Sequence, residues 1–265
     1  IKTSIENCKL EIPYRIDEEL PARPPVLCPG CPHRGVFYSL RRIKNAVITG
    51  DIGCYTLGAL PPFNAMDTCI CMGASIGMAH GISKVSDPSI KTIAVIGDST
   101  FIHSGITGLI DVVYNQGNST VVILDNSTTG MTGHQDHPGT GCTLKGSEVP
   151  PLDLVKLIEA IGIKHIRVVD PFELDQVEKV LREEVQRDEP SVVIMQRSCA
   201  LLNKSVKPPV EIDLDLCRKC NACLRLGCPA IQKKQDAMVI DLALCNGCGL
   251  CIGVCRFNAI RRTGE

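Results

Sequence analysis

The amino-acid sequence predicts an α/β domain with a doubly wound parallel sheet, followed by a small cysteine-rich α+β domain. Short apolar runs alternate with stretches of helical spacing as far as Gln196, which is the pattern of strands joined by crossover helices. Two of the apolar runs end in polar residues, at Asp98 and Asn126, as expected where parallel strands end at a functional site. After about position 210 cysteines recur every few residues.

The expected elements of the first domain follow one another in order. Residues 1–27 hold several prolines, which argue against a long helix or a central strand, so we expect an irregular lead-in. The last helix is amphipathic, with Leu174 and Leu181 among the apolar residues of one face. We expect strands at 46–49, 93–96, 121–124, 163–169 and 191–196, and helices at 74–85, 152–161 and 172–187.

These elements and the change in composition define the domain boundaries. The stretch from Lys204 to Pro209 holds two prolines and two lysines and is the expected connection between the domains. The expected segments are the lead-in at 1–27, the α/β domain at 28–203, a linker at 204–210 and the cysteine-rich domain at 211–265.

Composition limits the possible partners. A chain of 265 residues with 44% apolar side chains can bury a sizeable core. Because the net charge is −1 and basic runs are lacking, we expect neither nucleic acid nor a membrane as partner. No apolar stretch reaches the roughly 18 residues of a membrane span, and no signal segment opens the chain, so we expect a cytoplasmic protein. In that reducing compartment closely spaced thiols are more often metal ligands than disulfides, and most of the 16 cysteines lie in C-x-x-C steps.

The residues around Asp98 and Asn126 favour a cation that carries a diphosphate. Carboxylate and amide oxygens are hard ligands of the kind that Mg²⁺ prefers. Gly97 lets backbone N–H groups approach a phosphate, and the helix expected after Ser99 directs its positive end to the same place. The alternative is that an apolar strand followed by Gly-Asp forms an ordinary turn, but Asn126 at this distance favours the ligand site.

Two cysteine runs of similar spacing make up the C-terminal domain. The first is C-x2-C-x2-C-x4-C-P and the second is C-x2-C-x2-C-x3-C. Three thiolates at that spacing bind one 4Fe-4S cluster, and the fourth cysteine of each run ligates the other cluster. Zinc is the alternative, but the third cysteine in both runs does not suit a tetrahedral zinc ribbon. We therefore assign one cluster to Cys217, Cys220, Cys223 and Cys255, and the other to Cys245, Cys248, Cys251 and Cys228.

The first domain resembles the thiamine diphosphate-dependent enzymes through Gly97-Asp98-Ser99 and an asparagine that closes a second strand. In that family the Mg²⁺ ligands are the aspartate, the asparagine side chain and a backbone carbonyl two residues further on. The resemblance therefore implies Asp98, Asn126 and Thr128 as Mg²⁺ ligands. The implied cofactor-binding set is Gly97, Asp98, Ser99, Asn126, Thr128, Gly130, Met131, Gly53 and Cys54.

Together with its ferredoxin-like domain, the chain is similar to the 2-oxoacid:ferredoxin oxidoreductases. The motifs that most resemble the α subunits of the indolepyruvate type are LCPGCPHRG, GDIGCYTLG, CMGASIGMAHG, GDSTF and LDNSTTGMTGHQDHPG. The resemblance implies oxidative decarboxylation of aryl pyruvates to aryl-acetyl-CoA and CO₂. It implies thiamine diphosphate, Mg²⁺ and two 4Fe-4S clusters as cofactors, and coenzyme A as co-substrate. The implied partners are a smaller β subunit and ferredoxin, in an anaerobic setting.

The resemblance also implies a third 4Fe-4S cluster inside the first domain. In pyruvate-type enzymes such a cluster is held by a C-x-x-C, a cysteine after a glycine and a cysteine after a late strand. Cys28, Cys31, Cys54 and Cys199 match these positions. The alternative is that Cys54 and Cys199 are ordinary buried thiols and that Cys28 and Cys31 shape a loop.

Other functions stay open at this point. The chain could serve a pyruvate- or 2-oxoglutarate-type enzyme, or it could be an electron-transfer module without catalysis. The pyrimidine-binding domain that thiamine enzymes require does not fit into residues 1–27, so we expect a C-terminal portion that is inactive alone. No catalytic side chain is identified, although His33, His134 and His137 lie in motif loops from which they could reach cofactor or substrate.

Overall fold

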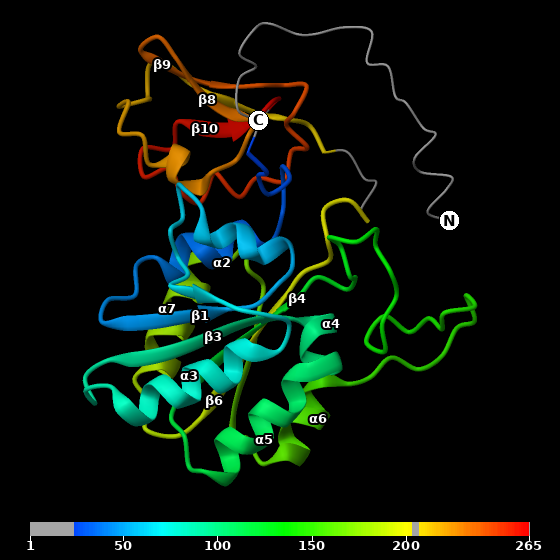
Figure 1. The fold of residues 1–265 in the computed structure, drawn as a ribbon. Helices are drawn as coiled ribbons and strands as arrows, with labels where there is room; N and C mark the ends of the chain where they lie inside the picture. Colours follow the sequence, from blue (N-terminus) through cyan, green and yellow to red (C-terminus); the bar gives the residue numbers. More distant parts are fainter. Residues whose placement is uncertain (1–23, 203–206, 265) are drawn as a thin grey trace, which may run out of the picture.

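The structure is a computed structural model that describes residues 24–202 and 207–264. An α/β part with a six-stranded sheet takes up most of the chain, and a small cysteine-rich part follows it. In Figure 1 the cysteine-rich part, orange to red, lies against the side of the α/β part that carries α2 (His33–Leu40). None of the helices in these ranges combines the length and the apolar character needed to cross a bilayer. Most of the predicted lead-in falls outside the described residues.

The sheet is parallel throughout, which confirms the predicted doubly wound fold. Its strand order is β2-β1-β3-β4-β6-β5, so the central strands β3 and β4 are neighbours. Gly97 pairs with Leu124 in their register, and both strands therefore end at the same edge. The strands are β1 Ala46–Gly50, β2 Thr68–Cys69, β3 Lys91–Gly97, β4 Thr120–Asp125, β5 His165–Val169 and β6 Ser191–Gln196.

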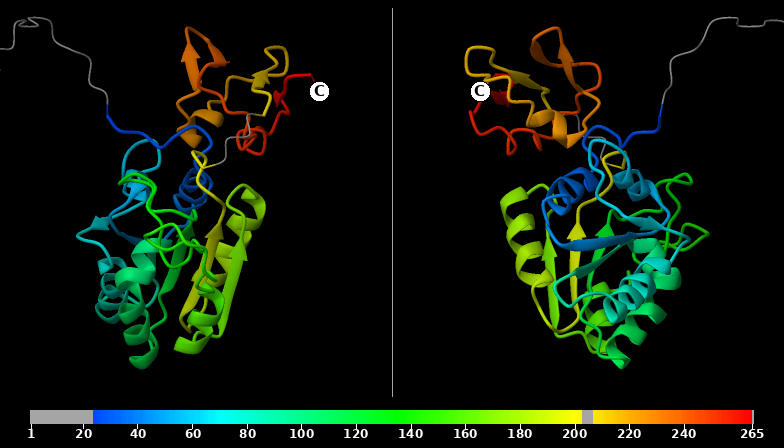
Figure 2. Two further views of the ribbon diagram at one scale, coloured as in Figure 1. Left: turned by 90° about the vertical axis from the view of Figure 1, so that its right-hand side faces the viewer. Right: turned by 60° about the vertical axis from the view of Figure 1, so that its left-hand side comes forward.

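Helices cover both faces of this sheet (Figure 2). Helices α2 and α7 bury apolar residues against one face, and α3, α5 and α6 do so against the other. Successive residues of β4 alternate between the two cores, with Val122 and Leu124 in the first and Val121 and Ile123 in the second. The helices are α3 Ala74–Val85, α5 Ile106–Tyr114, α6 Leu154–Ile161 and α7 Leu174–Val185.

The chain turns directly from β3 into a helix at the polar edge of the sheet. Helix α4 (Asp98–Thr100) continues through a π turn at Phe101–Gly105 into α5, so the helical run begins at Asp98 and not after Ser99. Gly97 precedes it, and a Cβ atom at this position would lie 2.7 Å from the Tyr55 ring. The close approach of Tyr55 therefore requires glycine here.

The cysteine-rich part consists of two antiparallel strand pairs and the loops that carry the cysteines. Its first strand begins at Val210, the last residue of the predicted linker. Tyr38 of α2 is buried in the same apolar core as Leu226 and Leu250, so the two parts pack directly on each other. The paired elements are β7 Val210–Ile212 with β10 Ile260–Arg262, and β8 Ile231–Lys234 with β9 Ala237–Ile240; a short η3 turn spans Cys223–Leu226.

Candidate functional site

Asp98 and Asn126 meet at the polar edge of the sheet because they follow neighbouring parallel strands. Asp98 is 2% exposed, and its Oδ2 accepts hydrogen bonds from the backbone N–H groups of Asn126 (3.2 Å) and Ser127 (2.9 Å). Its Oδ1 accepts another from the N–H of Ser99 at 2.7 Å. The carboxylate thus joins the ends of β3 and β4 at the start of the helical run.

The loop after β4 carries the other predicted Mg²⁺ ligands. Asn126 and Thr128 are buried, and Ser127 between them has a left-handed φ of 59°. The hydroxyl of Thr129 donates to Ser99 Oγ at 2.9 Å, which fastens this loop to the helix after β3. A carboxylate, an amide oxygen and a backbone carbonyl are hard oxygen donors, so the residues present fit Mg²⁺.

A cavity opens beside these residues, and the whole predicted cofactor-binding set lines it. Most of its walls come from three segments, which are the GDIGCY loop after β1, the start of the helical run after β3 and the loop after β4; His33 and Met72 complete the lining. The lining residues from the predicted set are Gly53, Cys54, Gly97, Asp98, Ser99, Asn126, Thr128, Gly130 and Met131.

His33 and Tyr55 also line this cavity. Their rings meet edge to face, with centroids 6.1 Å apart. Burial lowers the pKa of His33 to about 4, against the opposing influence of the Asp98 charge, so the imidazole is neutral at physiological pH. The hydroxyl of Tyr55 donates to the carbonyl of Ile52 (3.1 Å) and lies 3.3 Å from Thr100 Oγ1.

The other two histidines of the motif loops lie outside the lining of this cavity. His137 Nε2 lies 3.3 Å from Asp98 Oδ2, but the contact lacks the geometry of a hydrogen bond. Among the described residues this nitrogen has no other hydrogen-bond partner. His134 Nε2 lies 3.8 Å from Cys199 Sγ. Of the three candidates, His33 is therefore the one placed to face a bound cofactor.

Two further carboxylates at strand ends are tied to loops. Asp51 is fully buried and accepts hydrogen bonds from Ser75 Oγ (2.5 Å) and the N–H of Ala74 (3.1 Å) at the start of α3. Asp125 accepts hydrogen bonds from Gln196 Nε2 (2.9 Å) and the N–H of Ser127 (3.1 Å). Burial raises the pKa of both carboxyl groups. Their role in this structure is to hold the loops around the cavity.

Four cysteines of the α/β part gather although three separate segments carry them. Burial raises the pKa of Cys31 to about 12, and the neighbouring Cys28 and Cys199 thiols add to the rise. The pKa of Cys54 is also raised, by burial first and then by Cys199 and Cys28. The set proposed from the sequence for a third cluster is therefore brought together.

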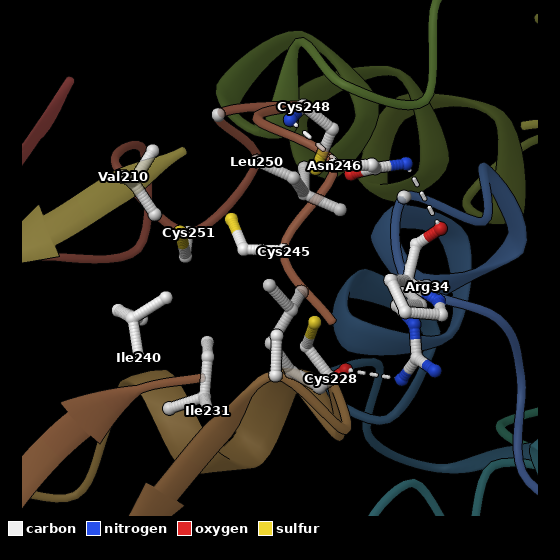
Figure 3. Close-up of a pocket in the computed structure, with 15 residues that line it drawn as sticks. Arg34, Val210, Cys228, Ile231, Ile240, Cys245, Asn246, Cys248, Leu250 and Cys251 are labelled. Atoms are coloured by element: carbon white, nitrogen blue, oxygen red, sulfur yellow. Dashed lines mark hydrogen bonds between the residues drawn. The ribbon is translucent and has the colours of Figure 1, made fainter. Parts of the chain in front are cut away.

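Four cysteines from both C-terminal runs line one cavity (Figure 3). They are Cys228, Cys245, Cys248 and Cys251, the set expected from the crossed ligation pattern. Burial raises the pKa of Cys251, and the other three thiols add to it. A thiolate in such surroundings needs a nearby positive charge, which iron ions supply.

A second cavity in the cysteine-rich part holds the other expected set. Arg218 and Phe257 also line it. Cys220 in this cavity is exposed, whereas Cys251 in the cavity of Figure 3 is buried. The four cysteines of this cavity are Cys217, Cys220, Cys223 and Cys255.

Within the described ranges, no group of three or more His, Cys, Asp or Glu side chains is arranged so that it could hold a single metal ion.

Two residues at the junction of the two parts were not singled out from the sequence. Arg34 is buried and lines the cavity of Figure 3, although it belongs to α2. Asn246 Nδ2 donates to the carbonyl of Pro29 at 3.1 Å. The signal for Arg34 is a charge inside the otherwise uncharged stretch from Val26 to Leu40, whereas Asn246 carries no such signal.

Comparison with known proteins agrees with this arrangement. Residues 51–195 match the family described as thiamine pyrophosphate enzyme, C-terminal TPP binding domain, and residues 238–261 match the 4Fe-4S binding domain. The chain is 42% identical over 259 residues to the indolepyruvate oxidoreductase subunit IorA of Archaeoglobus fulgidus, covering 93% of this chain and 41% of that subunit. It is 39% identical over 291 residues to subunit IorA of Pyrococcus abyssi, covering 100% of this chain and 45% of that subunit. The chain thus spans less than half the length of these curated relatives.

Two more distant matches each cover about two thirds or more of this chain. The 2-oxoglutarate synthase subunit KorB of Archaeoglobus fulgidus is 28% identical over 200 residues, covering 70% of this chain and 73% of that subunit. A solved structure of the 2-oxoglutarate:ferredoxin oxidoreductase from Magnetococcus marinus superposes with a TM-score of 0.59 at 18% identity, covering 69% of this chain and 67% of that one. At this identity the likeness supports the fold alone.

Proposed function

The chain belongs to the thiamine pyrophosphate enzymes, and on that premise we propose that it serves an indolepyruvate-type 2-oxoacid:ferredoxin oxidoreductase. The whole enzyme would convert aryl pyruvates to aryl-acetyl-CoA and CO₂ and pass the electrons to ferredoxin. The similarity to the IorA subunits supports this activity, and so does the match to a 4Fe-4S binding domain on the same chain. Coenzyme A is the proposed acyl acceptor.

One observation carries the proposal: Cys54 belongs both to the cofactor cavity and to a four-cysteine set. It lines the cavity, and a Cβ atom built on Gly130 would lie 3.7 Å from both Cys54 Sγ and Asn126 Nδ2. Burial raises the pKa of Cys54, and so do the nearby thiols of Cys199 and Cys28. A redox centre held by this set would lie beside the cofactor, where an electron acceptor is needed.

We propose that Asp98, Asn126 and the carbonyl of Thr128 hold Mg²⁺ and, through it, the diphosphate. The helical run that begins at Asp98 directs its N–H groups toward the same place. When bound, thiamine diphosphate supplies the carbanion chemistry that releases CO₂ from a 2-oxoacid. Because burial keeps His33 neutral, its ring has one N–H donor and one acceptor nitrogen for a bound substrate.

Three 4Fe-4S clusters would carry the electrons away from this cavity. The set with Cys54 would come first, because it borders the cofactor. The set with Cys228 would follow, because Arg34 and Asn246 connect its cavity to the α/β part. The set with Cys220 would come last, because this cysteine is exposed. The order runs from the buried cofactor to the surface.

Ferredoxin would dock where Cys220 reaches the surface. Three exposed basic residues lie beside the cysteines of this set in the sequence. We call them the exit patch; they are Arg218, Lys219 and Arg256. None of the three forms an ion pair with another residue that the structure describes. An acidic carrier would be attracted to this patch and oriented on it. The other proposed partner is a smaller β subunit, and the proposed setting is the cytoplasm of an anaerobic cell.

A second candidate is a 2-oxoglutarate-type enzyme of the same family. The 28% identity to KorB over 70% of this chain favours it, but the IorA subunits match more closely. Substrate preference of the assembled enzyme, measured anaerobically as CoA-dependent ferredoxin reduction, decides between them. We expect kcat/KM for indolepyruvate or phenylpyruvate to exceed that for 2-oxoglutarate and pyruvate by about tenfold or more. A preference for 2-oxoglutarate would instead assign the chain to the second type.

A further inference from the structure

Arg34 lies buried between two of the cysteine sets. Its side chain is among the largest that are fully buried, with 1% of the residue exposed. It belongs to α2, directly after the C-x-x-C of Cys28 and Cys31, and it reaches the edge of the cavity that Cys228 and Cys248 line (Figure 3). The guanidinium is therefore placed at the junction of the α/β part and the cysteine-rich part.

Backbone carbonyls from both parts hold the guanidinium in place. Its Nε donates to the carbonyl of Cys28 at 2.9 Å, and its Nη2 donates to that of Leu27. Its Nη1 donates to the carbonyl of Leu226 at 3.2 Å, which ends the η3 turn of the cysteine-rich part. Because the guanidinium is planar, these contacts fix both its position and its orientation.

The carbonyls do not neutralise the charge of Arg34. In the described ranges no carboxylate pairs with it; the arginines that do pair with Asp or Glu are Arg42, Arg182, Arg187, Arg197 and Arg261. An arginine keeps its proton in proteins, and a buried cation without an anionic partner is strongly unfavourable.

The groups that offer negative charge to Arg34 are cysteine thiols of two different sets. Burial lowers the pKa of Arg34, and the thiols that oppose this are Cys228, Cys31, Cys28 and Cys248. Two of these four come from the α/β part and two from the cysteine-rich part. Thiols become thiolates when they bind iron, so a loaded cluster on each side supplies the missing counter-charge.

We propose that Arg34 is a shared counter-ion of two 4Fe-4S clusters, the one with Cys28 and Cys31 and the one with Cys228 and Cys248. One-electron reduction adds one negative charge to a cluster and moves no other group. A fixed positive charge between the two clusters stabilises the reduced form of each, so it raises both reduction potentials. Arg34 thus acts as a positioning residue for electron transfer, and this inference rests on the proposed function because it requires both clusters.

The test compares Arg34→Gln and Arg34→Lys with the wild-type chain, each purified anaerobically. Iron content is measured first, and the reduction potentials are then measured by redox titration followed by electron paramagnetic resonance. Gln removes the charge, whereas Lys keeps it. Arg41→Gln is the matched control, because Arg41 also donates to a backbone carbonyl, that of Pro62 at 2.9 Å, but is exposed.

In Arg34→Gln we expect the one-electron reduction equilibrium of the two flanking clusters to become at least tenfold less favourable, a fall of about 59 mV. The cluster with Cys217 and Cys220 should change least, Arg34→Lys should recover most of the fall, and Arg41→Gln should match the wild type. Unchanged potentials in a loaded Arg34→Gln chain would overturn the inference.

If Arg34→Gln fails to bind iron, the Arg34→Lys variant decides whether the inference holds. If Arg34→Lys then binds iron with potentials near those of the wild type, the positive charge is what the clusters require, and the inference stands. If Arg34→Lys fails in the same way, Arg34 serves only to hold the carbonyls, and the inference is wrong. A wild-type chain without iron would remove the inference together with the cluster part of the proposed function. If the wild-type chain binds iron, any difference between it and the Arg34 variants concerns Arg34 alone.

Discussion

The carboxylate of Asp98 accepts a hydrogen bond from the backbone N–H of Asn126 at 3.2 Å, although the two residues are 28 positions apart in the sequence. This contact joins the ends of β3 and β4 and brings a carboxylate beside an amide side chain. A cavity lined by glycines opens next to them. Binding of Mg²⁺ and a diphosphate should therefore depend on this pair.

Replacing Asp98 should abolish the stabilisation that the cofactor provides. In the wild-type chain, thiamine diphosphate with Mg²⁺ at about 100 times its dissociation constant should stabilise the folded state by about 2.7 kcal/mol. Asp98→Asn removes the charge that holds Mg²⁺, so the thermal shift should vanish. Asp111→Asn, an exposed aspartate on α5, serves as the control and should keep the full shift. An equal shift in Asp98→Asn would rule out this cation site.

The crossed ligation pattern predicts which cluster each fourth cysteine serves. Cys228 is the fourth cysteine of the first run in sequence, yet it lines the cavity of Cys245, Cys248 and Cys251. Cys228→Ser should therefore disturb the cluster of the second run and leave the cluster of Cys217 and its partners intact. Electron paramagnetic resonance of the reduced variant, compared with that of Cys255→Ser, separates the two signals. Loss of the first-run signal in Cys228→Ser would contradict the crossed pattern.

A third cluster in the α/β part predicts a specific loss of iron. Cys199→Ser should lower the iron content by about one third, since one of three clusters is lost. The two signals of the cysteine-rich part should remain. Cys142 lies outside all three sets, so Cys142→Ser should keep the full iron content. If Cys199→Ser retained all its iron, Cys199 would be an ordinary thiol.

The exit patch predicts a salt-dependent effect on electron transfer. The variant Arg218→Glu with Lys219→Glu reverses the charge beside Cys220, so it should repel an acidic ferredoxin. Stopped-flow oxidation of the dithionite-reduced chain by ferredoxin should slow by about tenfold at low ionic strength, and the difference should shrink as salt is added. Lys179→Glu, on an exposed position of α7, is the control. Equal rates in both variants would place the docking surface elsewhere.

Asp51 should contribute to stability through the loop it holds. Asp51→Ala leaves the Ser75 hydroxyl and the N–H of Ala74 without their buried acceptor. This should cost about 1–3 kcal/mol, measurable as a lower unfolding temperature. Ser75→Ala removes only one of the donors and should cost less. Cofactor affinity should also fall in Asp51→Ala, since the loop that carries Gly53 and Cys54 begins at Asp51.

Much of the α/β fold could be predicted because burial dictates the residue pattern. The apolar runs that form β3, β4 and β6 are buried on both faces, so they stand out without any alignment. The helices with one apolar face, such as α7, show the expected spacing. Family membership followed from the Gly-Asp and Asn signals at the strand ends, and comparison with known proteins confirms it.

Short or irregular elements could not be predicted from periodicity. Strand β2 has only two residues, Thr68 and Cys69, too few for a pattern. Helix α2 is buried along its whole length, including Arg34, so it lacks the polar face that marks a surface helix. The helical run after β3 begins at Asp98, two residues earlier than expected, directly after the extended residue Gly97 that ends the strand.

The candidate site likewise contains residues that the sequence identifies and residues that it does not. Cysteine spacing is a local signal, so the two C-terminal sets could be assigned from the sequence, and the structure gathers each set around its own cavity. The role of Arg34 depends on contacts with Leu226, 192 positions away, which no local pattern encodes. The positions of His33 and Tyr55 in the cavity wall likewise arise from packing.

Iron and acid-labile sulfide content of the anaerobically purified chain, with electron paramagnetic resonance after dithionite reduction, is the most direct test of a three-cluster electron path. Three 4Fe-4S clusters predict about twelve irons per chain, with the first electron acceptor beside the thiamine diphosphate cavity. About eight irons would leave Cys28, Cys31, Cys54 and Cys199 as structural thiols. Zinc without iron would contradict the electron-transfer function altogether.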